Sequence, residues 1–468
     1  MLKIKNENEI TDITRRFLIV VTIFMIMIYF FNACSQSASN SNQSQFEQTT
    51  EVIVNVNETD EIEKDDESDA IVEETIDSTE EDEPQETKPS DEHILKRGYG
   101  FYEGEMDMRN ITDITFTRTA PETYDEKWSA NLADTDEIAG YRVGTSVFIV
   151  GDQIYFNESC GMMFCVENHY GDKCWENLRE VNGLELVDTS IVTSMYLMFC
   201  GGSSFTDLNV GNWDVSNVTD MRYMFAKCTS LESLNVENWD VGNVRDFSEM
   251  FSSLTQNTGA MNLKNIEIGS WDTSSAVYMS AMFYGCGKIT SLDVGNWDVS
   301  NVVDFNHMFA DCYKLADIDI SNWNTLNVRS FDALFNDCHG LTTIDVSNLE
   351  TSMCMQFSQM FESCINLTNI VGLENWDVSN ASYYAFSEMF HNCPKLTELN
   401  ISTWNTSNAD NMARMFKGCY GLKELDLSGF DIGKVETMAE MFDNCAWNLN
   451  VIGIEDWNLE TVNIENMW

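Results

Sequence analysis

Eight cysteines are the first candidates for chemistry, because thiols bind metals and form disulfides. Each lies three residues after a phenylalanine that recurs through the chain. Such regular placement suits either a ladder of metal-binding or redox-active thiols, or a column of small apolar side chains in a core. We favour free thiols in a core, where cysteine packs like a small hydrophobic residue. The eight are Cys228, Cys286, Cys312, Cys338, Cys364, Cys393, Cys419 and Cys445.

A second group, Cys160, Cys165, His169 and Cys174, superficially resembles a zinc knuckle. Its spacing differs from the usual one, so a zinc site is the least favoured interpretation. A disulfide between Cys165 and Cys174 is a second alternative. We favour separate thiols and predict no metal site.

The remaining candidates for catalysis are few. His307, His339 and His391 occupy variable positions of the repeat and are expected to face solvent. No carboxylate pair stands apart from the repeat as an acid–base couple, and the chain has no glycine-rich phosphate loop, G-x-S-x-G or H-E-x-x-H motif. We predict no catalytic residue, no cofactor and no enzyme. An enzyme would need a site within residues 95–175, where nothing indicates one.

Polar side chains that alternate with apolar ones in short predicted strands form the most distinctive set. Aligning the repeats places them on one side of a parallel sheet, the surface that solenoids use for partners. We predict that this face binds another macromolecule; a merely solvated face is the alternative. Stacked carboxylates repel, and cations such as Ca²⁺ would relieve this, but no compact ligand loop is present. The predicted binding face comprises Asp207, Asn209, Asn235, Glu267, Asp293, Asp317, Asp319, Asp345, Glu398, Asn400, Glu424 and Asp426.

One recurring aromatic sets the phase of the chain from about residue 176. Successive copies are mostly 26 residues apart, with one interval of 32 and one of 29, and methionine precedes almost all of them. Trp468 falls in the same phase. The longest interval indicates an insertion at Ser252–Asn265. The copies are Phe199, Phe225, Phe251, Phe283, Phe309, Phe335, Phe361, Phe390, Phe416 and Phe442. A fixed period of this length predicts a solenoid.

Each repeat contains two kinds of periodicity. Leu231, Leu234 and Val236 fit a short strand that ends at Trp239, whose side chain is expected to turn into the core. The preceding apolar residues fit one face of a helix capped by Ser216 or Asn217; they are Val218, Met221, Met224, Phe225 and Cys228. The predicted fold is α/β: a right-handed leucine-rich-repeat solenoid with one short parallel strand and one short helix per repeat of about 26 residues.

Residues 95–175 differ from the repeats. Ile111–Arg118 alternates between apolar and polar residues, as in a half-buried strand. Ser146–Asn157 fits two strands around Gly151 and Asp152, a hairpin pattern. We predict a small β-rich module that caps the repeats of residues 176–468.

The N-terminus indicates export. A basic segment precedes the apolar run Phe17–Phe31, which is short for a membrane span and ends near Cys34. Residues 1–33 resemble a bacterial lipoprotein signal peptide, which implies lipidation of Cys34 and a lipid-anchored, extracytoplasmic chain on the cell surface. An uncleaved signal anchor is the alternative. The membrane would then be a partner through the lipid anchor only.

Residues 34–94 are predicted to form a disordered acidic stalk. Residues 51–92 hold 19 acidic side chains and two basic ones. Such a composition cannot bury enough apolar surface to fold. The net charge of the chain, −51, disfavours nucleic acid as a partner.

The repeat pattern resembles a known family. The motif L-x-x-L-[DN]-[VI]-x-N-W-D-[VT]-S-N-V-x-D-[MF]-x-x-M-F-x-x-C is visible in Leu315–Phe335 and Leu341–Cys364. It resembles the BspA-like leucine-rich-repeat surface proteins, with the repeat shared with mycoplasma lipoproteins, over residues 145–468. Thr145–Phe164 is similar to the segment that this family places before its first full repeat. The resemblance implies surface display and adhesion to extracellular or host proteins or to other microbial surfaces. A structural spacer or surface-layer protein is the alternative.

Overall fold

The computed structural model describes residues 88–253 and 261–468, which lie in one compact unit, Gln85–Trp468. Cys34, the predicted signal peptide and most of the predicted stalk lie outside the described residues, as does half of the predicted insertion. Within the two described ranges, no helix is long and apolar enough to cross a membrane.

The N-terminal module contains a five-stranded sheet in the order β2-β3-β4-β1-β6. β1 lies parallel to β4 and β6, whereas β3 lies antiparallel to β2 and β4. The alternating segment predicted as a strand is β1, with Ile114 and Phe116 buried. The elements are η1 (Gly98–Phe101), η2 (Met108–Asn110), β1 (Asp113–Thr117), β2 (Glu126–Ser129), β3 (Ala139–Val143), β4 (Ser146–Val150), β5 (Ile154–Tyr155), β6 (Glu180–Asn182), η3 (Leu184–Leu186) and β7 (Val187–Asp188).

The hairpin predicted around Gly151 is wrong. Both strands exist, as β4 and β5, but they do not pair with each other. β4 already has β3 on one edge and β1 on the other, so neither edge is free for a hairpin partner. β5 pairs instead with β7, in parallel.

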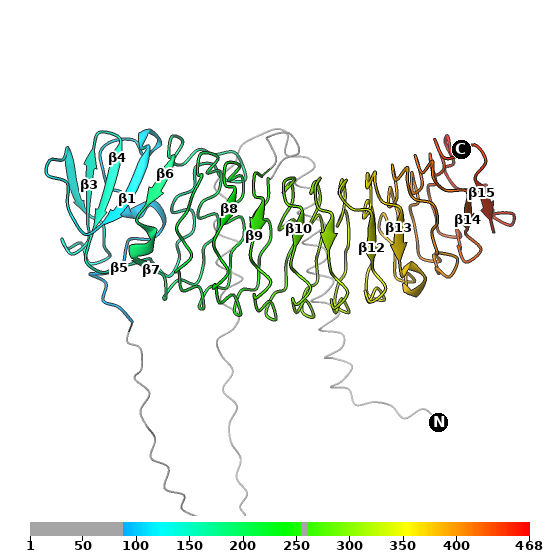
Figure 1. The fold of residues 1–468 in the computed structure, drawn as a ribbon, viewed down its shortest axis with the longest axis horizontal. Helices are drawn as coiled ribbons and strands as arrows, with labels where there is room; N and C mark the ends of the chain where they lie inside the picture. Colours follow the sequence, from blue (N-terminus) through cyan, green and yellow to red (C-terminus); the bar gives the residue numbers. More distant parts are fainter. Residues whose placement is uncertain (1–87, 254–260) are drawn as a thin grey trace, which may run out of the picture. The chain divides into compact units, whose positions relative to one another are not determined.

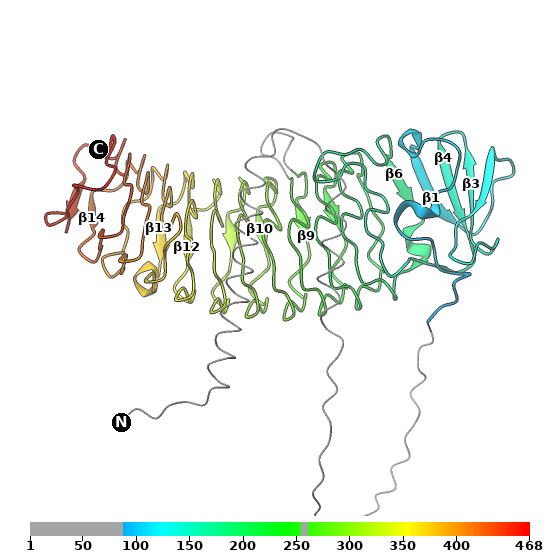
Figure 2. The same ribbon diagram turned by 180° about the vertical axis from the view of Figure 1, so that it is seen from behind.

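Short parallel strands repeat along the rest of the unit, as the sequence predicts (Figures 1 and 2). β8 pairs with β9, β10 with β11, β12 with β13 and β14 with β15, all in parallel. The bounds are β8 (Ser233–Leu234), β9 (Asn265–Ile266), β10 (Ser291–Leu292), β11 (Asp317–Ile318), β12 (Thr343–Asp345), β13 (Asn369–Val371), η4 (Leu373–Asn375), β14 (Glu424–Asp426) and β15 (Asn450–Ile452).

The predicted helix in each repeat is a further error: the described residues contain no α-helix. Consecutive turns take its place, and the backbone bonds to the neighbouring repeat. The N–H groups of Met221, Tyr223 and Phe225 donate to carbonyls one repeat later at 2.9–3.1 Å. Those of Met224 and Cys228 donate three residues back, at 3.2 and 3.1 Å. Alternate amides therefore join the repeats, which a helix would not allow.

Positive φ angles explain why these segments cannot be helical. In most repeats the residues two before and two after the recurring phenylalanine have positive φ, as at His307 (57°) and Asp311 (59°) around Phe309. A left-handed conformation costs a non-glycine residue about 1–2 kcal/mol and interrupts a right-handed helix. The hydrogen bonds between repeats compensate for this strain. The predicted N-cap of this helix is also absent, because the side-chain amide of Asn217 donates to the carbonyl of Ser190, 2.8 Å away.

The recurring phenylalanines form one continuous column through the core. Neighbouring rings from Phe164 to Phe442 are stacked with centroids 5.4–6.0 Å apart. Trp468 continues the column at 4.6 Å from Phe442. The phase predicted from the sequence is thus confirmed over the whole array.

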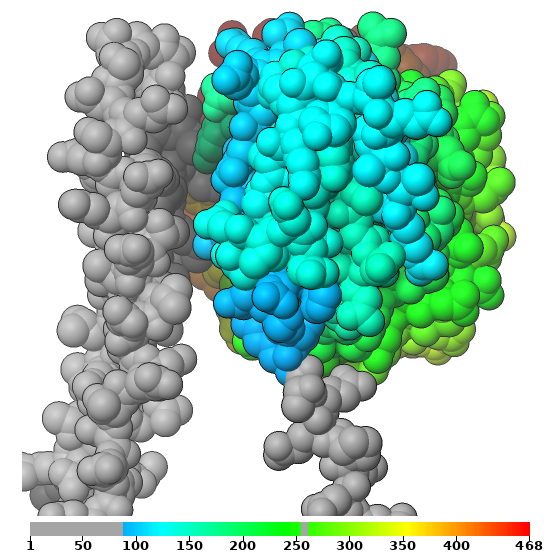
Figure 3. Space-filling view, turned by 90° about the vertical axis from the view of Figure 1, so that its left-hand side faces the viewer, coloured from blue at the N-terminus to red at the C-terminus, as the bar shows by residue number. Residues whose placement is uncertain are grey.

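The column begins inside the N-terminal module. Phe164 stacks on Phe199, and Ser159 forms a parallel bridge with Ser194. The predicted lead-in segment therefore includes the first rung of the array. The N-terminal module covers this end of the array (Figure 3).

Tryptophans form a second column at the end of the strands, as predicted for Trp239. Their rings are buried, and each Nε1–H donates to a backbone carbonyl of the preceding repeat at 2.9–3.1 Å. The donors are Trp213, Trp239, Trp271, Trp297, Trp323, Trp376 and Trp404.

The eight periodic cysteines form a third column, which confirms their assignment to the core. All are free thiols; seven are buried and Cys445 is half-buried. Each Sγ lies 3.0–3.4 Å from the carbonyl of a phenylalanine in the preceding repeat. Burial raises the pKa of these thiols, so they stay protonated.

Candidate functional site

The twelve residues of the predicted binding face, which we call the acidic strand face, lie on the outward side of the repeat strands or directly beside them. Eleven are exposed and Asp426 is half-buried, while the residues between them, such as Leu234 and Leu292, are buried. Parallel pairing of β10 with β11 places equivalent residues on adjacent rungs. Rungs of a parallel sheet are about 4.8 Å apart, so the carboxylates form a closely spaced row.

Glycines make room for this row. A side-chain carbon on Gly269 would lie 2.3 Å from the Asp293 carboxylate, and one on Gly211 would lie 2.8 Å from the Asn235 amide. These polar groups therefore lean over the backbone of the neighbouring repeat. The small residues beside the row are needed for the lateral packing of its members.

Some carboxylates of the face also have a structural role. Asp319, Asp345 and Asp426 each accept a hydrogen bond from the backbone N–H two residues later, at 2.9 Å. Bonds from Ser321 and Ser428 lower the pKa of Asp319 and Asp426, because they favour the ionised form. The turns that follow their strands therefore favour the ionised form of these two carboxylates.

Apolar side chains interrupt the acidic row at two places. Val371, at the end of β13, pairs with Asp345 and is 43% exposed. Ile452 pairs with Asp426 in the same way and is 37% exposed. The face thus presents apolar side chains among its acids, a combination that suits protein partners.

The histidines do not face solvent freely, contrary to the sequence-based expectation. His307, His339 and His391 are all half-buried. Each lies beside a carboxylate: Asp332 at 4.0 Å, Asp337 at 3.1 Å and Glu362 at 2.9 Å, respectively. Consecutive turns are present where helices were predicted, and they orient these side chains along the surface of the array.

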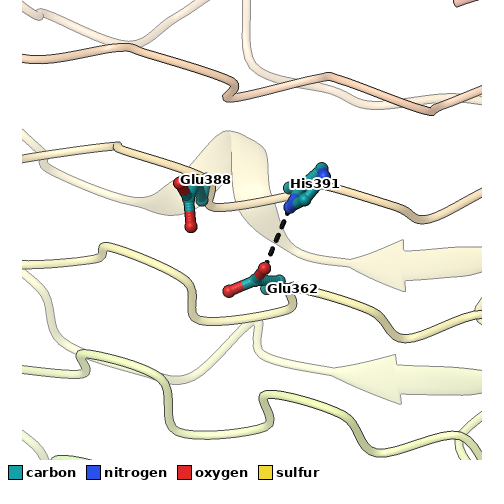
Figure 4. A group of neighbouring side chains, drawn as sticks. All are labelled: Glu362, Glu388 and His391. Atoms are coloured by element: carbon teal, nitrogen blue, oxygen red, sulfur yellow. Dashed lines mark hydrogen bonds and ion pairs between the residues drawn. The ribbon is translucent and has the colours of Figure 1, made fainter. Parts of the chain in front are cut away.

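One of these histidines lies close to two glutamates. Glu362, Glu388 and His391 offer ligand atoms that all lie within 4.8 Å of one another (Figure 4). It is the single such group of metal-ligand side chains in the part of the chain that the structure describes. Sequence reasoning missed it, because the residues come from two repeats whose surface contacts depend on the turn geometry.

The residues that superficially resemble a zinc knuckle, for which zinc is the least favoured interpretation, have different surroundings from one another. Cys160 is buried and donates to the Asn157 carbonyl at 3.2 Å. Cys165 instead makes thiol hydrogen bonds with Cys174 and with Cys200, a residue outside the motif. The bond from Cys165 lowers the pKa of Cys174 to about 6. All of these cysteines are free thiols, as favoured from the sequence.

Stacked parallel rungs with phenylalanine, tryptophan and cysteine columns place the described unit among leucine-rich-type repeat solenoids. A family model described as "Mycoplasma protein of unknown function, DUF285" matches residues 172–267, 253–372 and 356–468. The chain belongs to this family. The predicted resemblance to BspA-like leucine-rich-repeat surface proteins, with the repeat found in mycoplasma, is thereby confirmed.

Solved structures include distant likenesses. A leucine-rich cell surface protein from Faecalibacterium prausnitzii is 15% identical, with a TM-score of 0.34, covering 77% of this chain and 89% of that one. A leucine-rich-repeat protein from Bacteroides ovatus is 14% identical, with a TM-score of 0.26, covering 72% of this chain and 85% of that one. No curated protein matches the sequence.

Proposed function

We propose that the chain is displayed on a bacterial surface and binds extracellular or host macromolecules, or other microbial surfaces, through the acidic strand face. The observation that carries this proposal is the placement of its polar residues on one outward side of the parallel strands, interrupted by the apolar Val371 and Ile452. Glycines beneath Asn235 and Asp293 keep the row close-packed. A flat, regular face of this kind can contact a partner over many rungs at once.

Charge indicates the chemistry of the partner. The face carries carboxylates in three successive repeats at Asp293, Asp319 and Asp345. Basic or polar protein surfaces would gain most from such a row, and electrostatic attraction would speed their association. Nucleic acid would be repelled by the same charge.

The anchor belongs to the same proposal. Lipidation of Cys34 would hold the chain at the membrane while the acidic segment that follows spaces the repeats from it. Labelling growing cells with a radioactive fatty acid should mark the wild-type chain and leave Cys34→Ala unmarked. Equal labelling of both chains would rule out this anchor.

Binding is tested with the full chain against a panel of matrix proteins and whole bacterial cells. The variant D293N/D319N/D345N removes three charges from the acidic strand face but keeps side-chain oxygens that can accept the turn hydrogen bonds. We expect it to lose at least tenfold in affinity at low salt, since rim and surface charges act through long-range attraction.

A matched control changes three carboxylates outside the face. Asp272, Asp298 and Asp377 lie just after the tryptophan corner and accept backbone N–H bonds at 2.9–3.0 Å, as the face residues do. The variant D272N/D298N/D377N has the same change in net charge and the same altered turn chemistry. Equal binding by the two triple variants would show that the acidic strand face is not the binding surface.

A structural spacer is the second candidate function. The continuous phenylalanine column from Phe164 to Trp468 favours it, because every repeat is locked to the next. A spacer needs no ligand, so the absence of any specific partner on the panel, with wild-type surface display, would support this function instead.

A further inference from the structure

Glu362, Glu388 and His391 occupy equivalent or neighbouring places in two successive repeats. Glu362 and His391 each follow the recurring phenylalanine directly, and Glu388 lies two residues before Phe390. All three side chains are half-buried. The backbone hydrogen bond from Phe361 to the Met389 carbonyl, 3.0 Å long, holds the two segments side by side. The site is thus built on fixed rungs of the solenoid.

The three side chains point toward one another (Figure 4). The His391 Nδ1 atom lies 2.9 Å from Glu362 Oε1, and ligand atoms from all three side chains lie within 4.8 Å of one another. Two ligands that bind one cation about 2.1 Å away are separated by about 3–4 Å. Small side-chain rotations would therefore allow all three to contact one ion.

Amide groups orient both carboxylates from the outside. Asn336 Nδ2 donates to Glu362 Oε2 at 2.9 Å, which leaves Oε1 directed at the histidine. Gln359 Nε2 donates to Glu388 Oε2, also at 2.9 Å. Outer hydrogen bonds of this kind fix the orientation of metal ligands and raise affinity.

We propose that Glu362, Glu388 and His391 bind a divalent transition-metal cation of the zinc type, with water completing the coordination. One imidazole and two carboxylates are a ligand set that suits zinc, and the net charge of −51 enriches cations around the chain. The repeat between Phe361 and Phe390 has 29 residues instead of 26. A bound ion would link the two rungs at this irregular repeat.

Arg414 is the competitor for this site. Its guanidinium Nη1 donates to Glu388 Oε1 at 2.8 Å, and it also pairs with Glu440 at 3.1 Å. Without an ion, Glu388 is therefore paired with Arg414, while Glu362 keeps its hydrogen bond with His391. The two states differ in a testable way, since removing Arg414 should free Glu388 and favour the cation.

The experiment measures zinc binding to the purified full chain after treatment with a chelator, by equilibrium dialysis and calorimetry. We expect His391→Ala and Glu362→Gln to bind one ion fewer than the wild type. Asn336→Ala should keep the site but weaken it about tenfold or more, because it removes an outer hydrogen bond. Arg414→Gln should bind the ion at least as tightly as the wild type does.

His339→Ala is the matched control. His339 pairs with Asp337 at 3.1 Å on the same surface but belongs to no group of three ligands in the described residues. Counting ions relative to this control removes zinc bound by thiols such as Cys174. Equal stoichiometry in His339→Ala and His391→Ala would overturn the proposal. If His391→Ala does not fold, as judged by its thermal unfolding, a lower affinity in Arg414→Gln would overturn it instead.

Discussion

Tryptophan at the strand ends has a role that phenylalanine could not fill. Its ring packs in the core, while Nε1–H satisfies a carbonyl of the preceding repeat; Trp297, for example, donates to Ile268 at 3.0 Å. A buried N–H without a partner is costly, so the column also fixes the distance between repeats. Leu349 and Phe430 occupy the same place without a donor, which shows that packing alone suffices at two positions.

Trp297→Phe therefore should destabilise the solenoid by about 1–2 kcal/mol, through the lost hydrogen bond and some lost ring burial. Thermal or denaturant unfolding of the full chain measures this. Trp447→Phe is the control, because Trp447 is 97% exposed and should change stability by less than about 0.5 kcal/mol. Equal losses in both variants would mean that the Nε1–H bond contributes nothing.

Cys174 differs from the core thiols in reactivity. It is half-buried, and the hydrogen bond from Cys165, followed by that from Tyr99, lowers its pKa to about 6. We expect iodoacetamide to modify Cys174 faster than any buried cysteine of the described residues, at a rate nearly constant from pH 7 to pH 9. Peptide mapping of the native chain by mass spectrometry gives the rates. A rate that rises steeply over this range would contradict the lowered pKa.

At the scale of the element, periodicity predicted which residues are buried better than it predicted the backbone. Val218, Met221 and Phe225 are all buried, as expected for one face of a helix. The same spacing is met by consecutive turns, in which Tyr223 has a φ of 58°. The apolar pattern cannot distinguish a helix from consecutive turns, because the backbone conformation depends on hydrogen bonds to the adjacent repeat. The short strands were predictable because alternation leaves only one extended arrangement.

The two candidate sites also differ in how far the sequence predicts them. The acidic strand face follows from alternation within strands, so its members could be named from the sequence. Glu362 and His391 could be aligned as equivalent residues of successive repeats, but the approach of Glu388 depends on the positive φ of that residue (59°). The polar residues that flank the recurring phenylalanine in successive repeats are the signal by which this group of three could have been found.

A repeat should be removable as a unit. Deleting residues 287–312 removes 26 residues and brings Phe283 into the place next to Phe335, with every column in phase. Because each repeat contacts mainly its neighbours, we expect a folded chain with a small loss of stability. Deleting residues 287–299 shifts the phase by half a repeat and should abolish cooperative unfolding. Equal behaviour of the two deletions, compared by thermal unfolding and protease resistance, would contradict a nearest-neighbour array.

At the scale of the whole molecule, charge sets the response to pH. Burial raises the pKa of several carboxyl groups in the turn segments, among them Asp246, Asp304 and Asp332. Between their unfolded and folded pKa values the folded chain binds more protons than the unfolded chain does. Stability therefore falls as the pH rises through the folded values. Repulsion within a chain of net charge −51 acts in the same direction.

Other carboxyl groups set a lower limit to the pH range in which the folded chain is stable. Lys417 and Arg414 lower the pKa of Glu440 to about 2, and Arg142 lowers the pKa of Glu126. These ion pairs contribute stability that is present above the unfolded pKa and is lost as the pH falls through the folded one. We therefore expect thermal stability to rise as the pH falls from 8 toward the raised pKa values of the buried carboxyl groups, and to fall again below about pH 4.

Asp304→Asn separates the buried carboxyl group from the general effect of charge. The variant keeps an acceptor for the N–H of Asn306, which lies 2.8 Å from Asp304 Oδ1, but it cannot ionise. It should be more stable than the wild type at pH 8, with the difference shrinking as the pH is lowered toward pH 5, because the raised pKa of Asp304 lets it take up a proton at a higher pH than it does in the unfolded chain. Asp298→Asn, an exposed change of equal charge, controls for net charge at both pH values. If both variants shifted the midpoint of unfolding equally, overall repulsion would explain the pH dependence without any contribution from burial.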